Sequence, residues 1–458
     1  MGECREAGDQ RAGIRERGRR RLELLALLCS ARAIPVAAFV VVTAAEAVLF
    51  PAELAVTGWL VGSVADATAG GAGSTAAGRA EMAVAALGAI LLARQVLGPL
   101  SVVIGARIRR RIDGELLRRS QAAITGPVGM AHIHDPAVFA DLSLGGGDHG
   151  PGTDTPGGAA VGMVAQASRY AASLLAGAIV ARYSKVAAAA VLVAALAARY
   201  HTQRHHSAML ARFRALNIGY RRAGYSASLG ITPAAAKEVR LFGFGGWLAD
   251  RYGRDWGQVT GEMSSVRAGV RSRIARAHAG LLAVETAAVV HLGLMALDGR
   301  IAVGALTAAV WGTFRLGALA FATSDDFRVD QGLLALGAVR RLEARAGAEA
   351  AVTPPGAGRS AEGMPAGQIR FEAVTFAYPG GERPVLDGLD LTIPAGSSLA
   401  VVGANGAGKT TLVKLLGRLY EPGAGRVVVD GVPLADLDPA AWRARLAVIF
   451  QDFARYEL

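Results

Sequence analysis

The chain has little cysteine: two residues in 458, Cys4 and Cys29. Both lie in the first thirty positions, so a disulfide framework is excluded, and no His/Cys/Asp/Glu set has the spacing of a metal site. The histidines of the polar segments, His132 and His134 among them, are therefore interpreted as surface residues. Neither a disulfide-stabilised secreted domain nor a metalloprotein is indicated.

Acidic residues are also in deficit, with 37 Asp and Glu against 49 Lys and Arg, a net charge of +12 and a pI near 10.3. The excess arginine is confined to certain segments: the head before residue 34, residues 107–119 and residues 199–276. Residues 65–78 and the short turn 298–300 contain little of it. This alternation follows membrane topology and not a base-reading surface, so nucleic acid is excluded as a partner. The arginine bias places the head, both long loops and the C-terminal region in the cytoplasm.

The first three quarters of the chain are too apolar for a soluble domain, and the whole chain is 52% hydrophobic with a mean hydropathy of +0.34. Six apolar segments approach or exceed the roughly 20 residues that cross a bilayer. They are residues 35–64, 82–106, 157–181, 186–198, 278–297 and 301–322. The fourth is short and needs Lys185 and Arg199 to reach the interface. The first is interpreted as a retained signal anchor, because residues 22–29 are too short for a signal peptide. We expect an all-α polytopic transmembrane domain of six helices.

Ionisable residues within these segments are functional candidates. Glu46 and Glu53 are seven positions apart and share one helix face. Their possible partners are Arg94, Glu285, His291 and Arg315. A polar cavity for a solute and pairing between helices both remain open.

Two polar segments between the spans are predicted to be cytoplasmic and helical. Residues 109–143 are predicted to form a long amphipathic helix that continues the second span. Residues 199–276 form the second segment, with Thr232–Phe242 near its middle. They are either transmitters of motion to a soluble motor or solvated loops.

A phosphate-binding loop of the form G-x-x-x-x-G-K-[ST] carries the clearest chemistry. It comprises Gly403, Ala404, Asn405, Gly406, Ala407, Gly408, Lys409 and Thr410, and Thr411 follows. Glycines let successive N–H groups surround phosphate oxygens, Lys409 reaches the β- and γ-phosphates, and the Thr410 hydroxyl binds Mg²⁺. The apolar run 398–402 is predicted to be a buried strand and residues 410–416 a helix, which places an anion at a helix N-terminus. The expected ligands are ATP and Mg²⁺.

Six spans, cytoplasmic helical loops, a linker and a phosphate-loop domain together resemble an ATP-binding cassette (ABC) exporter half-transporter. Residues 368–379 are similar to the opening strand of the family's cassette, which implies that Tyr378 stacks on adenine. Residues 385–396 resemble the strand before the phosphate loop, and residues 448–452 resemble the Q-loop, which implies that Gln451 contacts Mg²⁺. Residues 236–242 are similar to a coupling segment of bacterial members. The resemblance implies a multi-domain protein with a basic head (1–33), a transmembrane domain (34–343), a linker (344–367) and part of an α/β ATP-binding domain (368–458).

The chain ends at Leu458, seven residues after Gln451. The family's signature sequence, its catalytic aspartate–glutamate pair and its switch histidine would lie further on. No residue for positioning the attacking water is found, so no catalytic residue is assigned, and this chain alone is not expected to hydrolyse ATP.

Two function classes follow. The first is a subunit of the plasma membrane that exports an amphipathic solute, such as a drug, lipid or peptide, as a homodimer or as a heterodimer with another half-transporter. The alternative is a non-catalytic membrane protein that binds nucleotide weakly and depends on another chain. A membrane-tethered P-loop enzyme is a third, weaker reading.

Overall fold

The computed structural model describes residues 19, 21–70, 75–145, 155–215, 217–352, 358–381 and 383–450. It divides into two compact units. The first, here the cassette unit, comprises Met1–Ala31, Ile108–Ala160 and Arg328–Leu458. The second, here the membrane unit, comprises Arg32–Arg107 and Val161–Phe327. The boundaries of these compact units therefore differ from the domain boundaries predicted at residues 343 and 367, because parts of the long helices belong to the cassette unit.

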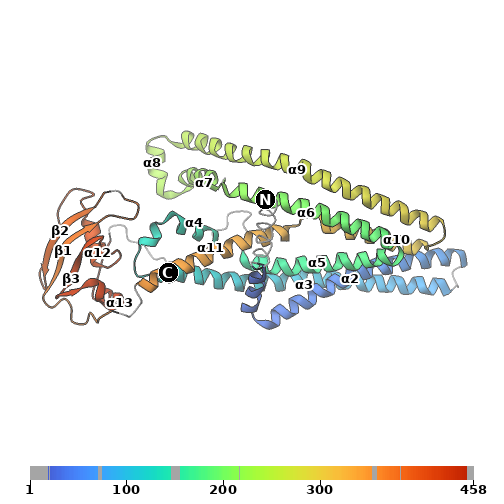
Figure 1. Ribbon diagram of the computed structural model, residues 1–458, viewed down its shortest axis with the longest axis horizontal. Coiled ribbons are helices and arrows are strands. Elements are labelled where there is room, and N and C mark those ends of the chain that lie inside the picture. The colour runs from blue at the N-terminus through green and yellow to red at the C-terminus, as the bar shows by residue number, and fades with distance from the viewer. Residues whose placement is uncertain are drawn as a thin grey trace, which may run out of the picture. The chain divides into compact units, whose positions relative to one another are not determined.

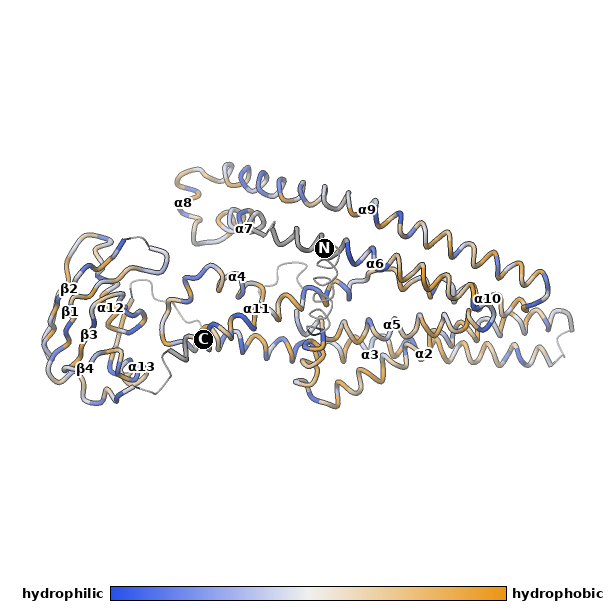
Figure 2. Tube along the Cα trace, in the orientation of Figure 1, coloured by the Kyte–Doolittle hydropathy of each residue, from blue (hydrophilic) through white to orange (hydrophobic). Residues whose placement is uncertain are grey.

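The helical part is built from helices of very different lengths, several of them long (Figure 1). In chain order they are α2 (Ala33–Gly70), α3 (Thr75–Thr125), α4 (Pro136–Gly145), α5 (Pro156–Tyr183), α6 (Lys185–Ala215), α7 (Asn217–Ile231), α8 (Ala236–Leu241), α9 (Gly245–Leu297), α10 (Val303–Gly317) and α11 (Ser324–Val352). Figure 2 shows the change of character within one helix: the first half of α9 is richer in hydrophilic residues, and its second half is mainly hydrophobic.

Five helical stretches in the described residues are long and apolar enough to cross a membrane. They are Ala33–Thr68, Thr75–Thr125, Pro156–Tyr183, Gly245–Leu297 and Val303–Ala348. The predicted fourth span, residues 186–198, lies in α6, which is helical but falls outside this set. The all-α membrane architecture is confirmed, whereas the sixth crossing stays a prediction.

Within the membrane unit, small residues allow α2 and α10 to approach closely. A Cβ on Gly58 would lie 2.5 Å from the carbonyl oxygen of Gly304, and one on Gly304 would lie 2.9 Å from the amide nitrogen of Gly62. Close backbone approach is how helices gain packing energy in lipid, where the hydrophobic effect between helices is lost. Helices α6 and α9 pack along each other, with α10 beside both. Val191, Leu292 and Leu316 are buried among them.

Two helix predictions need correction. The long helix predicted for residues 109–143 ends at Thr125, because Gly126 and Pro127 follow and the position before a proline disfavours helix. A 3₁₀ turn (Ala131–His134) and α4 come next. The linker predicted from residue 344 is helical as far as Val352, the end of α11. The predicted tight turn after α9 is confirmed, with Gly299 at a φ of +70°.

The cassette unit contains a four-stranded antiparallel sheet in the order β2-β1-β3-β4. The strands are β1 (Gln368–Phe376), β2 (Leu386–Pro394), β3 (Ala424–Val429) and β4 (Val432–Pro433). A bulge between Phe371 and Val374 shifts the alternation, so that both side chains point to the core. Helices α12 (Lys409–Leu416) and α13 (Pro439–Arg443) add Leu415 and Trp442 to that core. Both β1 and β2 match strands predicted from the sequence.

The strand predicted for residues 398–402 is wrong for the described structure. This segment forms no strand, and Leu399, Val401 and Val402 are 48%, 46% and 90% exposed. A strand requires a neighbour for its backbone N–H and C=O groups, and none of the four described strands pairs with it. The prediction rested on the apolar composition of the segment, which does not determine whether a neighbouring strand is present.

Candidate nucleotide site

The phosphate loop immediately precedes the first turn of α12. Gly406 and Gly408 have φ values of +87° and +86°, a region that other residues rarely adopt. A Cβ on Gly408 would also lie 2.9 Å from a Leu386 methyl carbon and 3.1 Å from the Val385 carbonyl oxygen. The fixed glycine Gly408 is therefore required by backbone conformation and by lack of space, and Gly406, at a variable position of the motif, by backbone conformation alone.

Lys409 closes the loop upon itself. Its Nζ donates to the carbonyl oxygens of Gly403 and Ala404, both at 2.7 Å. An ammonium held over the loop's own carbonyls lies where an incoming phosphate oxygen would be attracted. The Thr410 side chain is exposed at the same end of α12, whereas Thr411 is buried. The loop thus offers a cation, backbone amides and a free-standing hydroxyl together, as ATP and Mg²⁺ would need.

Tyr378 lies against the other side of α12. Its hydroxyl is 3.1 Å from Thr411 Oγ1, and the Lys414 ammonium lies 5.3 Å from its ring centre. The ring is half-buried and packs edge-on against Phe376 at 5.1 Å. The structure thus places the predicted adenine-binding ring in contact with α12, the short helix that directly follows the phosphate loop. Asn405 and Ala407 belong to the loop, and Gln451 lies outside the described residues.

The loop after α3 is attached to this same region, a contact that the sequence did not reveal. The Met130 N–H donates to the Leu419 carbonyl oxygen at 2.8 Å, and Arg443 Nη2 donates to the Val128 carbonyl oxygen at 2.6 Å. A third bond joins His134 Nε2 to the Tyr420 hydroxyl at 2.6 Å. These bonds span about 290 to 315 residues of sequence, so no local pattern could have indicated them.

Burial changes the acid–base properties of two of these groups. It raises the pKa of the Tyr420 phenol above its ordinary value, despite the nearby Lys414 ammonium. The phenol therefore keeps its proton and can donate to His134 Nε2. Burial likewise lowers the pKa of Arg443 from its ordinary value, with the Arg418 charge adding to the effect. Arg443 uses its N–H groups on the carbonyl oxygens of Gly417, Arg418 and Val128.

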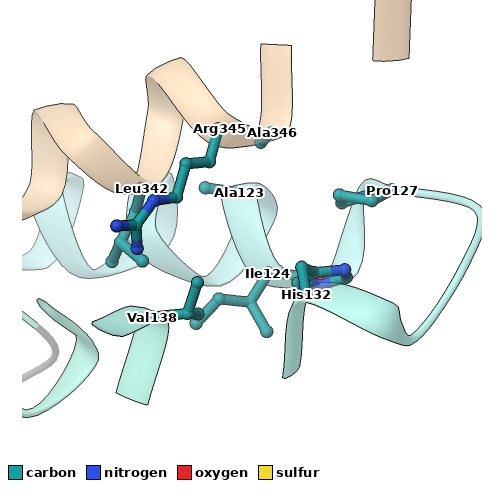
Figure 3. Close-up of a pocket in the computed structure, with 8 residues that line it drawn as sticks. All are labelled: Ala123, Ile124, Pro127, His132, Val138, Leu342, Arg345 and Ala346. Carbon is teal, nitrogen blue, oxygen red and sulfur yellow. The ribbon is translucent and has the colours of Figure 1, made fainter. Parts of the chain in front are cut away.

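A small pocket lies between the same loop and α11 (Figure 3). Its lining is Ala123, Ile124, Pro127, His132, Val138, Leu342, Arg345 and Ala346. None of the predicted nucleotide-binding residues lines it. His132 and Arg345 supply its polar groups, and a 2.9 Å hydrogen bond joins His132 Nε2 to the Ile124 carbonyl oxygen. We therefore interpret the pocket as a gap where the loop packs on the helices, separate from the candidate nucleotide site.

In the membrane unit, several of the ionisable residues contact residues of other segments. Arg94 of α3 pairs with Glu53 of α2, and a 3.2 Å hydrogen bond joins His291 of α9 to Ser184, which lies between α5 and α6. Glu46 lies 3.5 Å from Ser101 Oγ, and Glu285 is buried beside Gly317.

Arg315 differs from these. Its guanidinium lies 4.4 Å from the ring centre of Phe50, and Arg94 lies 5.0 Å from the same ring. The Nε atom of Arg315 is buried and has no hydrogen-bond partner in the described residues. Two cations thus share one aromatic ring, and Glu53 pairs with only one of them.

Comparison with known proteins places these features in a family context. Residues 386–457 match the model of the ABC transporter family. Over 97 residues the chain is 47% identical to an ATP-dependent lipid A-core flippase of Chromobacterium violaceum, which is 21% of this chain and 17% of that protein. Over 91 residues it is 46% identical to a fatty acid ABC transporter ATP-binding/permease protein of Mycobacterium bovis, 20% of this chain and 14% of that one. The aligned stretches thus span less than a fifth of these relatives.

The whole fold has a wider match. A bacterial Atm1-family ABC exporter with ATP bound superposes with a TM-score of 0.58 at 18% identity. The superposition covers 92% of this chain and 72% of the exporter. The similarity extends through the long helices as well as the cassette.

Proposed function

We propose that this chain is an ABC exporter half-transporter of the membrane, that it binds MgATP at the phosphate loop, and that it couples this binding to export of an amphipathic solute. The observation that carries the proposal is the joint placement of Lys409, Thr410 and Tyr378 around α12, within an exporter fold. Phosphate, metal and base would each meet a suitable group there. Gly403–Gly408 would supply amides to the phosphates, and Gln451 a second metal ligand.

Two such chains, identical or not, would form the working transporter, since one cassette per chain leaves each nucleotide site without a second face. The arginine-rich loops and the cassette would lie in the cytoplasm, as the positive-inside rule requires. The head (1–33), the membrane domain (34–343), the linker (344–367) and the ATP-binding part (368–458) would be its functional divisions.

The residues of the membrane unit favour an amphipathic solute as the transported molecule. Its helices are apolar, and within them the Arg94 and Arg315 guanidinium groups lie beside Phe50. A solute with an apolar body and a polar group would suit both the apolar helices and these cations. The relatives named above are a lipid A-core flippase and a fatty acid transporter, and lipid A-core and fatty acids are molecules of this character.

Binding measurements on the full chain in lipid nanodiscs test the nucleotide site. Lys409→Ala should reduce affinity for MgATP by about 10-fold or more, because a charged hydrogen-bond donor to phosphate contributes about 1.5–3 kcal/mol. Tyr378→Ala should weaken ATP and ADP by the same factor, since stacking on a base contributes about 1–3 kcal/mol whatever the phosphate number.

Lys237→Ala is the matched control, because Lys237 is an exposed lysine of α8 and lies in the other unit. Equal ATP affinity in the wild type and in Lys409→Ala would refute the assignment. If Tyr378→Ala weakened binding of ATP and not of ADP, the proposed stacking of Tyr378 on the base would be refuted.

A further inference from the structure

A continuous set of contacts leads from the loop after α3 to the phosphate-loop helix. His134 is bonded to the Tyr420 hydroxyl, and the Tyr420 ring packs edge-on against Tyr378, with centres 5.3 Å apart and planes at 85°. The Tyr378 hydroxyl in turn lies 3.1 Å from Thr411 Oγ1. The His134 ring also lies edge-on to Tyr378, at 6.3 Å. Four residues from three parts of the chain are thus in serial contact.

Tyr420 is the central member of this set. It is only 4% exposed, and a buried phenol requires a hydrogen-bond partner. His134, an exposed residue of the loop, provides one. The ring of Tyr420 therefore cannot move without either losing this bond or carrying the loop with it.

Simple attachment of the loop does not account for the arrangement. The loop is already bonded through Met130 to Leu419 and through Val128 to Arg443. Neither of those bonds reaches Tyr378. The bond between His134 and Tyr420 differs from them because its tyrosine contacts the ring assigned to the base.

We propose that Tyr420 is a positioning residue that holds Tyr378 in place for the nucleotide base, and that His134 ties this position to the loop after α3. Base binding and the state of that loop are then coupled. The inference rests on the proposed function, because it requires nucleotide to bind beside Tyr378. It adds a route, through Tyr378, Tyr420 and His134, by which binding of the base and not of the phosphates would affect the loop after α3.

The test compares a ligand with a base and a ligand without one. MgATP and magnesium tripolyphosphate are titrated into the full chain in nanodiscs. Tyr420→Phe keeps the ring and removes the bond to His134, and His134→Ala removes the same bond from an exposed position. Each should weaken ATP about 3- to 10-fold, the effect of one hydrogen bond, and leave tripolyphosphate unchanged. His134→Gln, which can still accept from the phenol, should retain most of the affinity.

The control is His201→Ala, because His201 is an exposed histidine that also lies edge-on to a tyrosine, Tyr200, at 5.8 Å. It should change neither ligand. Amide hydrogen exchange in the loop 128–134 provides a second measurement. ATP should slow that exchange in the wild type, tripolyphosphate should not, and His134→Ala should abolish the difference.

The outcomes separate the two proposals. If the wild type binds both ligands and Tyr420→Phe and His134→Ala weaken neither or weaken both equally, the positioning role is wrong and the nucleotide site stands. If the wild type binds neither ligand, the proposed function fails and this inference fails with it. Loss of ATP affinity alone, restored in His134→Gln, would support it.

Discussion

The two arginines at Phe50 predict an asymmetric response to neutralising the membrane ion pair. Glu53 pairs with Arg94, while Arg315 approaches the same ring and has no ion-pair partner among the described residues. Glu53→Gln leaves two uncompensated cations beside one ring. Arg94→Gln instead leaves one cation and one carboxylate near each other. The first substitution should therefore be the more damaging.

The size of the difference follows from the geometry. The guanidinium carbons lie 5.0 and 4.4 Å from the ring centre, so they can be no further apart than the sum, 9.4 Å. At an effective dielectric constant of about 20, two unit charges at that distance repel by about 2 kcal/mol. Removing one member of a fully buried pair costs about 3–5 kcal/mol. The Arg94 and Glu53 side chains are 36% and 23% exposed, so we expect a smaller loss for each substitution, with the loss for Glu53→Gln about 2 kcal/mol greater than that for Arg94→Gln.

Unfolding of the chain in mixed micelles by increasing SDS, followed by tryptophan fluorescence, measures both losses. The informative control is the Arg315→Gln background, in which the repulsion is absent and the two substitutions should cost the same. Equal losses in the wild-type background, or a greater loss for Arg94→Gln, would refute the reasoning. So would an asymmetry that persists without Arg315.

Two further predictions concern packing and pH. Gly304→Val should destabilise the membrane unit by about 1–3 kcal/mol, because its side chain would meet the backbones of Gly58 and Gly62; the same SDS titration checks it, and Gly293→Val, with open space around it on α9, should have little effect. Asp430 accepts the backbone N–H groups of residues 366, 367 and 368 at 2.7–2.8 Å, and these bonds lower its pKa below the usual 3.8. A lowered pKa contributes stability that is present above the ordinary value and lost as the pH falls through the lowered one. Asp430→Asn should therefore reduce the thermal midpoint at pH 7, and the gap to the wild type should narrow below about pH 4; a gap that is constant with pH would contradict the charge argument.

The parts of the fold that the sequence predicted are those with local causes. Helix α12 begins at Lys409, directly after a glycine in the left-handed region, and the turn at Gly299 follows the last apolar residue of α9. Strands β1 and β2 were predicted from the resemblance of residues 368–379 and 385–396 to strands of the ABC cassette. The hairpin between β3 and β4 was not predicted, although its two-residue turn, formed by Asp430 and Gly431 with positive φ, also has a local cause. Each of these features is decided within a few residues.

The parts that were missed depend on partners far away in sequence. Nothing near His134 indicates Tyr420, and nothing near Glu53 selects Arg94 over the other arginines of the spans. The helix predicted through residue 143 failed for a local reason that was available, namely Pro127 after Gly126. There the apolar periodicity was given more weight than the proline.

The segment 398–402 shows the physical limit of such reasoning. Five apolar residues in a row favour burial, but burial is a property of the surroundings and not of the segment. In the described structure Val402 is 90% exposed, and Ile449, in another apolar run, is 93% exposed. In the described structure neither segment has the backbone hydrogen bonds to a neighbouring strand that would make it part of a sheet. The phosphate loop that follows residue 402 is nevertheless formed, with its glycines in the left-handed region and Lys409 over its carbonyls. The loop conformation is therefore set by its own glycines and by α12, and does not require the preceding residues to be in a sheet.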